Sequence, residues 1–310
     1  MRIVFFGTSD FAVPSLVKLN GYHKIAAVVT KPDKPKGRRL LLRPSLIKLK
    51  AQELNIPLFL IERDYREQAI DELKGYDADL FVVIAYGGIL PSDILSIPNL
   101  YSIGVHASLL PKYRGAAPIN WAILNGEKTT GVTVFKLSEE MDTGDIILQR
   151  RVEILDSDDA GTLSLKLSEE GANLLLEAMG LIEGRKEQFI KQREEDATYA
   201  PRLRKEEGII YWTKDATYIH NQVRAMYRWP GASSNLSGRT IKIWRASVAE
   251  PQVKGTYKPG EIIKVEQNGI SVACGKGALS IKELQLAGGK QMSVSDFLQG
   301  HKISAGDFFL

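Results

Sequence analysis

Two short stretches of the chain carry residue types that could do acid–base chemistry. In the first, Ser102–Pro111, an apolar strand delivers His106 into a turn that proline fixes. In the second, Met141–Asp145, Asp142 comes 36 residues after His106 and could bring a carboxylate to the same place. A histidine can donate to a developing oxyanion, and a carboxylate can orient the ring and draw a proton away. Taken alone, His106 at a strand end favours catalysis, whereas Asp142 is better explained as the cap of a turn.

The elements that would position these residues alternate between strand and helix. Short β-branched apolar runs predict buried parallel strands, and the segments between them predict helices. The predicted strands are 2–6, 25–29, 80–84 and 101–106, and the predicted helices are 8–19, 64–73 and 162–182. This order implies a Rossmann-like, doubly wound parallel α/β sheet, whose ligands bind at the carboxyl ends of the strands. His106 lies at one such end, and Ala85–Gly88 follows another.

The glycine pattern after the first predicted strand argues against a nucleotide cofactor. Phe6–Asp10 makes a strand-to-helix turn, but it lacks the G-x-G-x-x-G spacing that brings a backbone close to a pyrophosphate. We read a plain turn there.

The pattern changes after the long predicted helix. The segment 183–201 is polar and charged, as a linker would be, and alternating strands follow at 239–245, 269–273 and 278–284. Residues 218–228 predict a helix that stops before Pro230. We therefore expect a catalytic domain over 1–190, a linker over 191–205, and a small C-terminal OB-like β-barrel domain over 206–310.

The bulk composition is that of an ordinary soluble globular protein. The chain has 310 residues, of which 44% are hydrophobic and 25% charged, and its single cysteine, Cys274, excludes an internal disulfide framework. No apolar run is long enough to span a bilayer, and no signal peptide precedes the first strand. We expect a cytoplasmic monomer that binds no metal and no membrane.

The charge is distributed unevenly along the chain. Residues 201–310 carry 16 Lys and Arg against 9 Asp and Glu, whereas the other 200 residues carry 25 against 28. A basic domain suits an acidic partner such as nucleic acid, but a solvated basic surface explains the charge equally well.

The segments 105–118 and 141–145 together resemble the active site of the folate-dependent formyltransferase family. The resemblance runs nearly end to end, and it implies transfer of a formyl group from 10-formyltetrahydrofolate, a co-substrate, to an amine. His106 would stabilise the oxyanion and Asp142 would manage the amine proton, without a metal. The resemblance reverses the interpretation of Asp142 as a mere cap, because the family's catalytic aspartate falls at this spacing.

The resemblance also implies a pterin-binding groove. Apolar walls with backbone groups able to read a polar edge suit a flat heterocycle. The implied residues are Ala85, Tyr86, Gly87, Ile89 and Leu90 on one side, and Ser108, Leu109, Leu110 and Pro111 on the other.

Family members that formylate methionine on initiator tRNA share further regions with the chain. Their loop matching 31–39 enters the acceptor-stem region, and Arg38 aligns with an arginine credited with key contacts; without the resemblance, a solvated loop is the commoner explanation. The C-terminal domain resembles the barrel that grips tRNA from the other side. The implied contacts are Lys36, Arg38, Arg39, Arg224, Arg228, Lys242 and Arg245, with Tyr227, Trp229 and Trp244 either stacking on bases or buried in the core.

One position departs from the family's pattern. The family carries Asn two residues before the histidine, and this chain has Gly104. Losing one oxyanion donor typically costs about 10²–10³ in rate. A natural variant with a substitute donor, a deliberate knock-down substitution and a folate-binding protein with little turnover all stay open. We expect a true formyltransferase whose activity is reduced.

Three other functions compete with this expectation. A formyl-folate hydrolase module or a sugar-nucleotide N-formyltransferase could have the same layout, but neither has an evident use for the basic loop. The third is a non-catalytic tRNA-binding relative, which only Gly104 favours.

Overall fold

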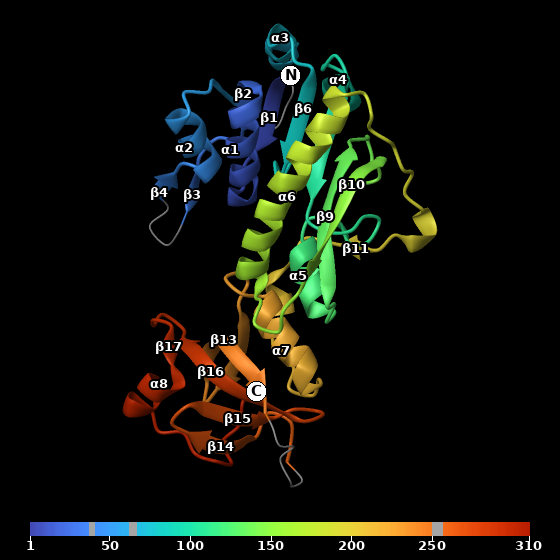
Figure 1. Cartoon of the computed structure of the whole chain (residues 1–310). Coiled ribbons are helices and arrows are strands. Elements are labelled where there is room, and N and C mark those ends of the chain that lie inside the picture. Colours follow the sequence, from blue (N-terminus) through green and yellow to red (C-terminus); the bar gives the residue numbers. More distant parts are fainter. Residues whose placement is uncertain (37–40, 62–66, 250–256) are drawn as a thin grey trace. The chain divides into compact units, whose positions relative to one another are not determined.

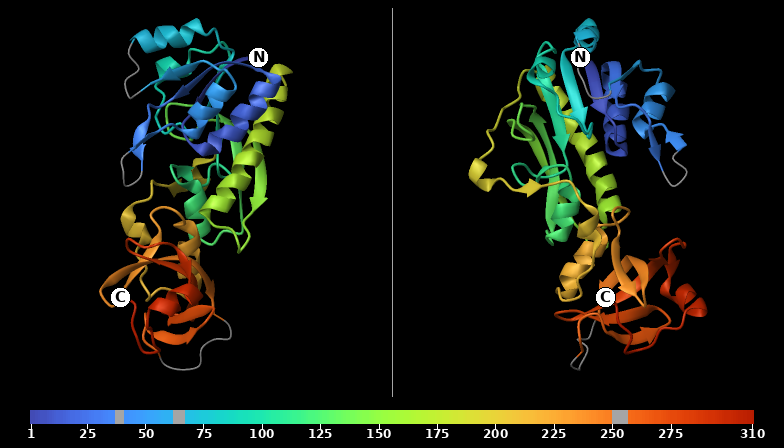
Figure 2. Two further views of the ribbon diagram at one scale, coloured as in Figure 1. Left: turned by 90° about the vertical axis from the view of Figure 1, so that its left-hand side faces the viewer. Right: turned by 180° about the vertical axis from the view of Figure 1, so that it is seen from behind.

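The chain folds into two compact units. A computed structural model describes residues 1–36, 41–61, 67–249 and 257–310. Unit 1 comprises Met1–Pro118, Thr129–Glu153 and Ser164–Pro201, and unit 2 comprises Ile119–Lys128, Ile154–Leu163 and Arg202–Leu310. Figures 1 and 2 show the elements of each unit.

Unit 1 is built on a seven-stranded sheet with the order β10-β9-β7-β6-β1-β2-β5. Its strands are β1 (Arg2–Gly7), β2 (Lys24–Thr30), β5 (Leu58–Leu60), β6 (Leu80–Ile84), β7 (Tyr101–His106), β9 (Thr129–Lys136) and β10 (Ile146–Glu153). The five strands from β5 to β7 pair in parallel, which confirms the Rossmann-like sheet. At one edge the sheet continues with β9 and β10, two strands that the sequence analysis did not predict, and these pair antiparallel. The sequence of β10 fits this place, because its residues alternate between partly buried and exposed along most of the strand, as is common in antiparallel strands.

Helices cover both faces of this sheet, as a doubly wound fold requires. They are α1 (Val13–Tyr22), α2 (Leu46–Glu53), α3 (Glu67–Gly75), α4 (Ser92–Leu95) and, from residue 164 on, α6 (Ala160–Glu183). On one face, Phe6 and Phe81 pack with Leu73 of α3 and Ile94 of α4. On the other, α6 crosses the sheet (Figure 1) with Gly171 against Val105 of β7. A Cβ at position 171 would lie 3.0 Å from Val105 Cγ1, so the glycine lets α6 approach the sheet closely.

Short elements complete unit 1. They are η1 (Asp10–Ala12), β3 (Lys34–Lys36), β4 (Leu41–Arg43), β8 (Arg114–Gly115), η2 (Glu194–Asp196) and β11 (Tyr199–Ala200). Ser9 caps η1 through a hydrogen bond from the Phe11 amide. The polar segment that we expected to be a linker contains η2 and β11, and β11 pairs in parallel with β8.

Unit 2 contains an antiparallel sheet with the order β12-β13-β16-β15-β14, and β17 pairs with β16. Its elements are α5 (Pro118–Leu124), η3 (Lys205–Gly208), α7 (Ala216–Ala225), β12 (Ala232–Leu236), β13 (Arg239–Val248), β14 (Ile262–Glu266), β15 (Gly269–Ala273), β16 (Ala278–Leu286), β17 (Met292–Ser293) and α8 (Val294–Gly300). The helix α7 begins two residues earlier than the predicted helix over 218–228, and its last residue lies three residues before residue 228.

The predicted OB-like barrel is not closed by its own edge strands. In the described part of the chain, β12 and β14 do not pair with each other. Residues 307–310 lie along both edges instead: Asn235 and Leu310 exchange backbone hydrogen bonds of 3.1 and 2.8 Å. On the opposite side, the Phe309 amide donates to Gly260 O at 2.8 Å and the Ile262 amide to Asp307 O at 2.8 Å. Residues 307–310 therefore contact both edges of the sheet, where a closed barrel would pair β12 directly with β14.

Within residues 1–36, 41–61, 67–249 and 257–310, no helix combines the length and the apolar character that crossing a bilayer requires.

Candidate active site

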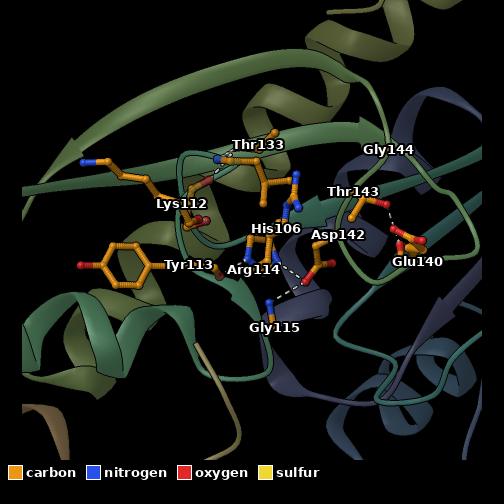
Figure 3. A network of polar contacts seen from close by, with 12 residues as sticks. His106, Lys112, Tyr113, Arg114, Gly115, Thr133, Glu140, Asp142, Thr143 and Gly144 are labelled. Carbon is orange, nitrogen blue, oxygen red and sulfur yellow. Dashed lines mark hydrogen bonds and ion pairs between the residues drawn. The ribbon is translucent and has the colours of Figure 1, made fainter. Parts of the chain in front are cut away.

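His106 ends β7 and points at two polar groups (Figure 3). Its side chain is largely buried, at 9% exposure. Nε2 lies 2.9 Å from the Tyr113 carbonyl oxygen, and Nδ1 lies 3.6 Å from Asp142 Oδ2. A carbonyl can only accept, so Nε2 carries the hydrogen and Nδ1 faces the carboxylate. The structure therefore brings the pair expected from the sequence together, with the ring and the carboxylate in close contact but at more than hydrogen-bond distance.

Asp142 lies in the loop between β9 and β10, in a left-handed backbone conformation with φ 59°. Asn and Asp are among the few non-glycine types that adopt this conformation readily. Oδ2 accepts a hydrogen bond of 2.8 Å from the Gly115 amide (Figure 3). Two residues on, a Cβ at Gly144 would lie 1.7 Å from Lys136 O, so only glycine fits there. The loop thus aims the carboxylate at the amide of Gly115 and at the ring of His106.

Ser108–Pro111, the turn after His106, is held by the neighbouring antiparallel strands. Thr133 stands opposite His106 in the β7–β9 register. Its hydroxyl donates to Ser108 O at 2.7 Å and accepts from the Leu110 amide at 3.1 Å. Gln149 of β10 donates to Leu110 O at 2.8 Å and to Thr133 Oγ1 at 2.9 Å. These contacts fix the backbone of the predicted folate-binding turn.

Gly104 stands directly opposite Phe135 in the same register. A Cβ at position 104 would lie 2.9 Å from Phe135 Cε1 and 3.0 Å from Leu137 Cδ2. Phe135 is 3% exposed and packs with Leu110 and Ile146. Its ring meets the His106 ring edge-on, with centroids 6.5 Å apart. The space beside His106 on this strand is therefore filled by an aromatic ring.

The second predicted folate-binding stretch, residues 85–90, follows β6, the parallel neighbour of β7. Tyr86 and Leu90 belong to the core cluster that contains Phe6, whereas Ile89 is 69% exposed. Ala85 has φ 46° and Gly87 φ 73°, so the chain turns sharply as it leaves the sheet. Thr8 Oγ1 donates to Tyr86 O at 3.0 Å and holds this turn against the one after β1. The loops after β6 and β7 thus emerge at the same sheet edge.

The residues implied as tRNA contacts lie in different parts of the chain and differ in their environments. Arg38 and Arg39 lie outside the described residues, and Lys36 is in β3. Arg224 of α7 uses its guanidinium for hydrogen bonds within the chain. It donates to Leu155 O and Asp158 O at 3.0 Å and to Asn221 Oδ1 at 2.7 Å. Burial lowers the pKa of this guanidinium.

Two of the other implied tRNA contacts, Arg228 and Lys242, lie against a small aromatic group. Lys242 donates to Pro230 O at 2.7 Å and lies 5.4 Å from the Trp244 ring centroid. Trp244 meets Tyr227 edge-on at 6.0 Å, and Arg228 lies over the Tyr227 ring. Trp229 is 52% exposed. Arg245 is exposed, with Nη1 3.6 Å from Glu283.

Sequence reasoning missed several residues that touch the candidate site. They are Thr133, Phe135, Gln149, Thr198, Gln192 and Arg114. The signal available for Thr133 was a polar residue inside the apolar run Val132–Phe135, which is unusual for a buried strand. We find no comparable signal for Gln192, which lies in a polar segment. Among the described residues, no cluster of three or more His, Cys, Asp or Glu side chains could hold a metal ion.

Both units of the chain match the domains of a known class of enzymes. Residues 1–179 match the formyl transferase family model, and residues 202–302 match the model of the formyl transferase C-terminal domain. The methionyl-tRNA formyltransferase of Citrifermentans bemidjiense is 44% identical over 309 residues, which cover 99% of this chain and 95% of that protein. That of Pelotomaculum thermopropionicum is 45% identical, covering 99% and 97%. The chain therefore belongs to the formyl transferase family, among its methionyl-tRNA formyltransferases.

Solved structures share the fold at lower identity. HypX from Aquifex aeolicus, in complex with tetrahydrofolic acid, has a TM-score of 0.66 at 20% identity, covering 99% of this chain and 50% of that one. An N-formyltransferase from Helicobacter canadensis, in complex with folinic acid and dTDP-3-aminofucose, has a TM-score of 0.68 at 22% identity, covering 91% and 98%.

Proposed function

We propose that this chain transfers the formyl group of 10-formyltetrahydrofolate to the α-amino group of methionine on initiator tRNA. The observation that carries the proposal is the His106–Asp142 pair, with Nδ1 and Oδ2 3.6 Å apart at the end of β7, in a chain that matches both formyl transferase domains. The full-length likeness to methionyl-tRNA formyltransferases supports the choice of acceptor.

The chemistry follows from what each group can do. The deprotonated amine attacks the formyl carbon, a new C–N bond forms, and negative charge develops on the formyl oxygen. The bond from carbon to N10 of the folate then breaks. Asp142 carries the amine proton away, and N10 gains a proton as tetrahydrofolate leaves.

The oxyanion role of His106 requires a change of partner. In the structure Nε2–H donates to Tyr113 O, 2.9 Å away. To donate to the developing oxyanion, the ring must release this carbonyl when the substrates bind. The hydrogen bonds of catalytic groups in an unliganded enzyme commonly differ from those formed once the substrates are bound.

The test of the acceptor is the product itself. The protein is incubated with 10-formyltetrahydrofolate and methionine-charged initiator tRNA, and the amino acid released from the tRNA is identified by mass spectrometry. N-formylmethionine from the initiator tRNA, and far less from a methionine-charged elongator tRNA, is the expected result. Unformylated methionine from both would refute the proposal. A translation-initiation role also implies a cytoplasmic location and, on our expectation, a monomer, which gel filtration checks.

A further inference from the structure

The last segment of unit 1, which follows α6, is bound to the two loops of the candidate site. We name residues 190–200 the strap; it is the yellow stretch that follows α6 in Figure 1. At one end, Ile190 and Ile146 exchange backbone hydrogen bonds of 2.8 and 2.9 Å, directly after the Asp142 loop. At the other end, β11 pairs with β8, directly after the His106 turn. The strap therefore joins the two loops that supply the candidate catalytic pair.

Gln192 of the strap grips the Asp142 loop. Its Nε2 donates to Asp142 O at 2.8 Å and to Gly144 O at 2.7 Å. These two carbonyls flank Thr143, in the turn that places Asp142 at φ 59°. A left-handed conformation at a non-glycine residue costs free energy and persists only where surrounding contacts hold it. The carboxamide of Gln192 supplies such contacts.

Arg114 fixes which way that carboxamide points. Its Nε and Nη2 lie 3.1 and 3.0 Å from Gln192 Oε1. Only the oxygen of an amide can accept from a guanidinium, so the amino group is left to face the two carbonyls. Nη1 binds Glu194 Oε1 and Oε2 of the strap at 2.9 and 2.8 Å. The Arg114 side chain is 2% exposed, which limits competition from water at its guanidinium, whereas the Glu194 side chain is 70% exposed.

Arg114 also stands between the backbone groups that touch the catalytic pair. The preceding carbonyl, of Tyr113, accepts from His106, and the following amide, of Gly115, donates to Asp142. Thr198 of the strap holds the same stretch, with its hydroxyl accepting from the Tyr113 amide at 2.8 Å.

We propose that Gln192 and Arg114 are positioning residues, which hold the Asp142 carboxylate against His106 through the strap. The catalytic part of this proposal rests on the proposed function. The claim that these residues position Asp142 does not rest on it, because hydrogen exchange of the Gly115 amide, which donates to the carboxylate, can be measured without any substrate.

The test compares Gln192→Glu and Gln192→Ala with the unchanged protein. Gln192→Glu keeps the volume and still accepts from Arg114, but it sets an oxygen against the two carbonyls. The matched control is Gln188→Ala, which alters an exposed glutamine four residues earlier. For each protein, exchange of the Gly115 amide is measured by NMR, kcat and KM by tetrahydrofolate release, and folding by thermal melting.

In both Gln192 variants, we expect the Gly115 amide to exchange about tenfold faster or more, because its acceptor moves away. We expect kcat to fall by about 10–100-fold, as when other outer partners of a catalytic group are lost. The KM for the formyl donor should change by less than about twofold, since the donor-binding turn is untouched. Gln188→Ala should behave like the unchanged protein.

Unaltered exchange at Gly115 in both variants would overturn the proposal, whatever the activity. Faster exchange with unaltered kcat would overturn its catalytic part, as would an equal loss of kcat in Gln188→Ala. If the unchanged protein forms no formylated product, the proposed function has failed, and the exchange at Gly115 alone still decides whether the strap positions Asp142.

Discussion

At the scale of single residues, the site depends on two backbone conformations that most side chains avoid. Tyr113 has φ 60° and Asp142 φ 59°, and they supply the carbonyl and the carboxylate that face His106. Such conformations cost about 1–3 kcal/mol each and tend to gather at functional sites. Here the cost is offset by contacts from the Gly115 amide and from the strap.

The charge of Asp142 can be tested with its backbone left in place. Asn tolerates the left-handed region, and its amide oxygen can still accept from Gly115, so Asp142→Asn should fold normally. Without a carboxylate to take up the proton, kcat should fall by about 10²–10⁴-fold. The measurement is formylation of charged initiator tRNA at saturating substrates. An unaltered kcat would contradict the role of Asp142.

Gly104 can be tested by adding the missing carboxamide. In Gly104→Asn the new side chain meets Phe135 and Leu137, so the free energy of unfolding should fall by about 1–3 kcal/mol. The double variant Gly104→Asn with Phe135→Leu should recover part of that loss, because a smaller side chain makes room. Chemical denaturation measures both.

The turnover of the same variants tests whether the missing carboxamide would stabilise the oxyanion. No gain in turnover, even in the double variant, would mean that the missing amide does not limit the site. Equal stability of Gly104→Asn and the unchanged protein would contradict the packing of Phe135 against position 104.

At the scale of elements, the sequence predicted the strands that form short runs of apolar residues. The strands 80–84 and 101–106 have the predicted bounds, and β1 extends one residue beyond the predicted 2–6. The structure brings His106 and Asp142 within 3.6 Å of each other, a pairing that the local sequence left open and only the family resemblance favoured. The contacts of Thr133 and Gln149 could not be predicted, because they depend on the register of β7, β9 and β10. The antiparallel direction of β9 and β10 and the contacts of the strap could not be predicted either, because they depend on pairing between segments that lie far apart in the sequence.

Thr133 gives a test of that register. Thr133→Val removes the hydroxyl and leaves the buried Leu110 amide without its acceptor, which typically costs about 1–3 kcal/mol. The matched control is Thr130→Val on the same strand, where the buried hydroxyl has no hydrogen-bond partner within the described part of the chain.

Chemical denaturation should therefore show a loss of stability for Thr133→Val and none for Thr130→Val. The KM for the formyl donor should rise only in Thr133→Val, because Ser108–Pro111 loses its anchor. Equal effects of the two substitutions would contradict the assigned network.

At the scale of the whole molecule, we expect the formyl donor to bind unit 1 and the tRNA to bind the basic loop over 31–39 and unit 2. Arg38→Ala should then weaken binding of initiator tRNA and reduce the salt slope of that binding by about 1, because one phosphate contact is lost. Donor binding should not change. The control is Arg151→Ala, at an exposed arginine of β10. Equal losses for tRNA and donor would count against the role of Arg38.

The single cysteine reports whether unit 2 is folded. Cys274 is buried at 7% exposure, and burial raises the pKa of its thiol to about 12. Because the thiolate is the reactive form, alkylation at pH 8 should be about 10³-fold slower than in the unfolded chain. Mass spectrometry of iodoacetamide-treated protein, with and without denaturant, measures the difference. Prompt alkylation of the native protein would contradict the packing around β15 and β16.

The most direct test of the central claim is release of tetrahydrofolate from 10-formyltetrahydrofolate, with and without methionine-charged initiator tRNA. The account predicts release that depends on the charged tRNA, at a rate that shows how far Gly104 limits the site. Release at the same rate without tRNA would contradict it and indicate a hydrolase. No release from a protein that still binds the tRNA would also contradict it and leave a binding protein on an enzyme fold.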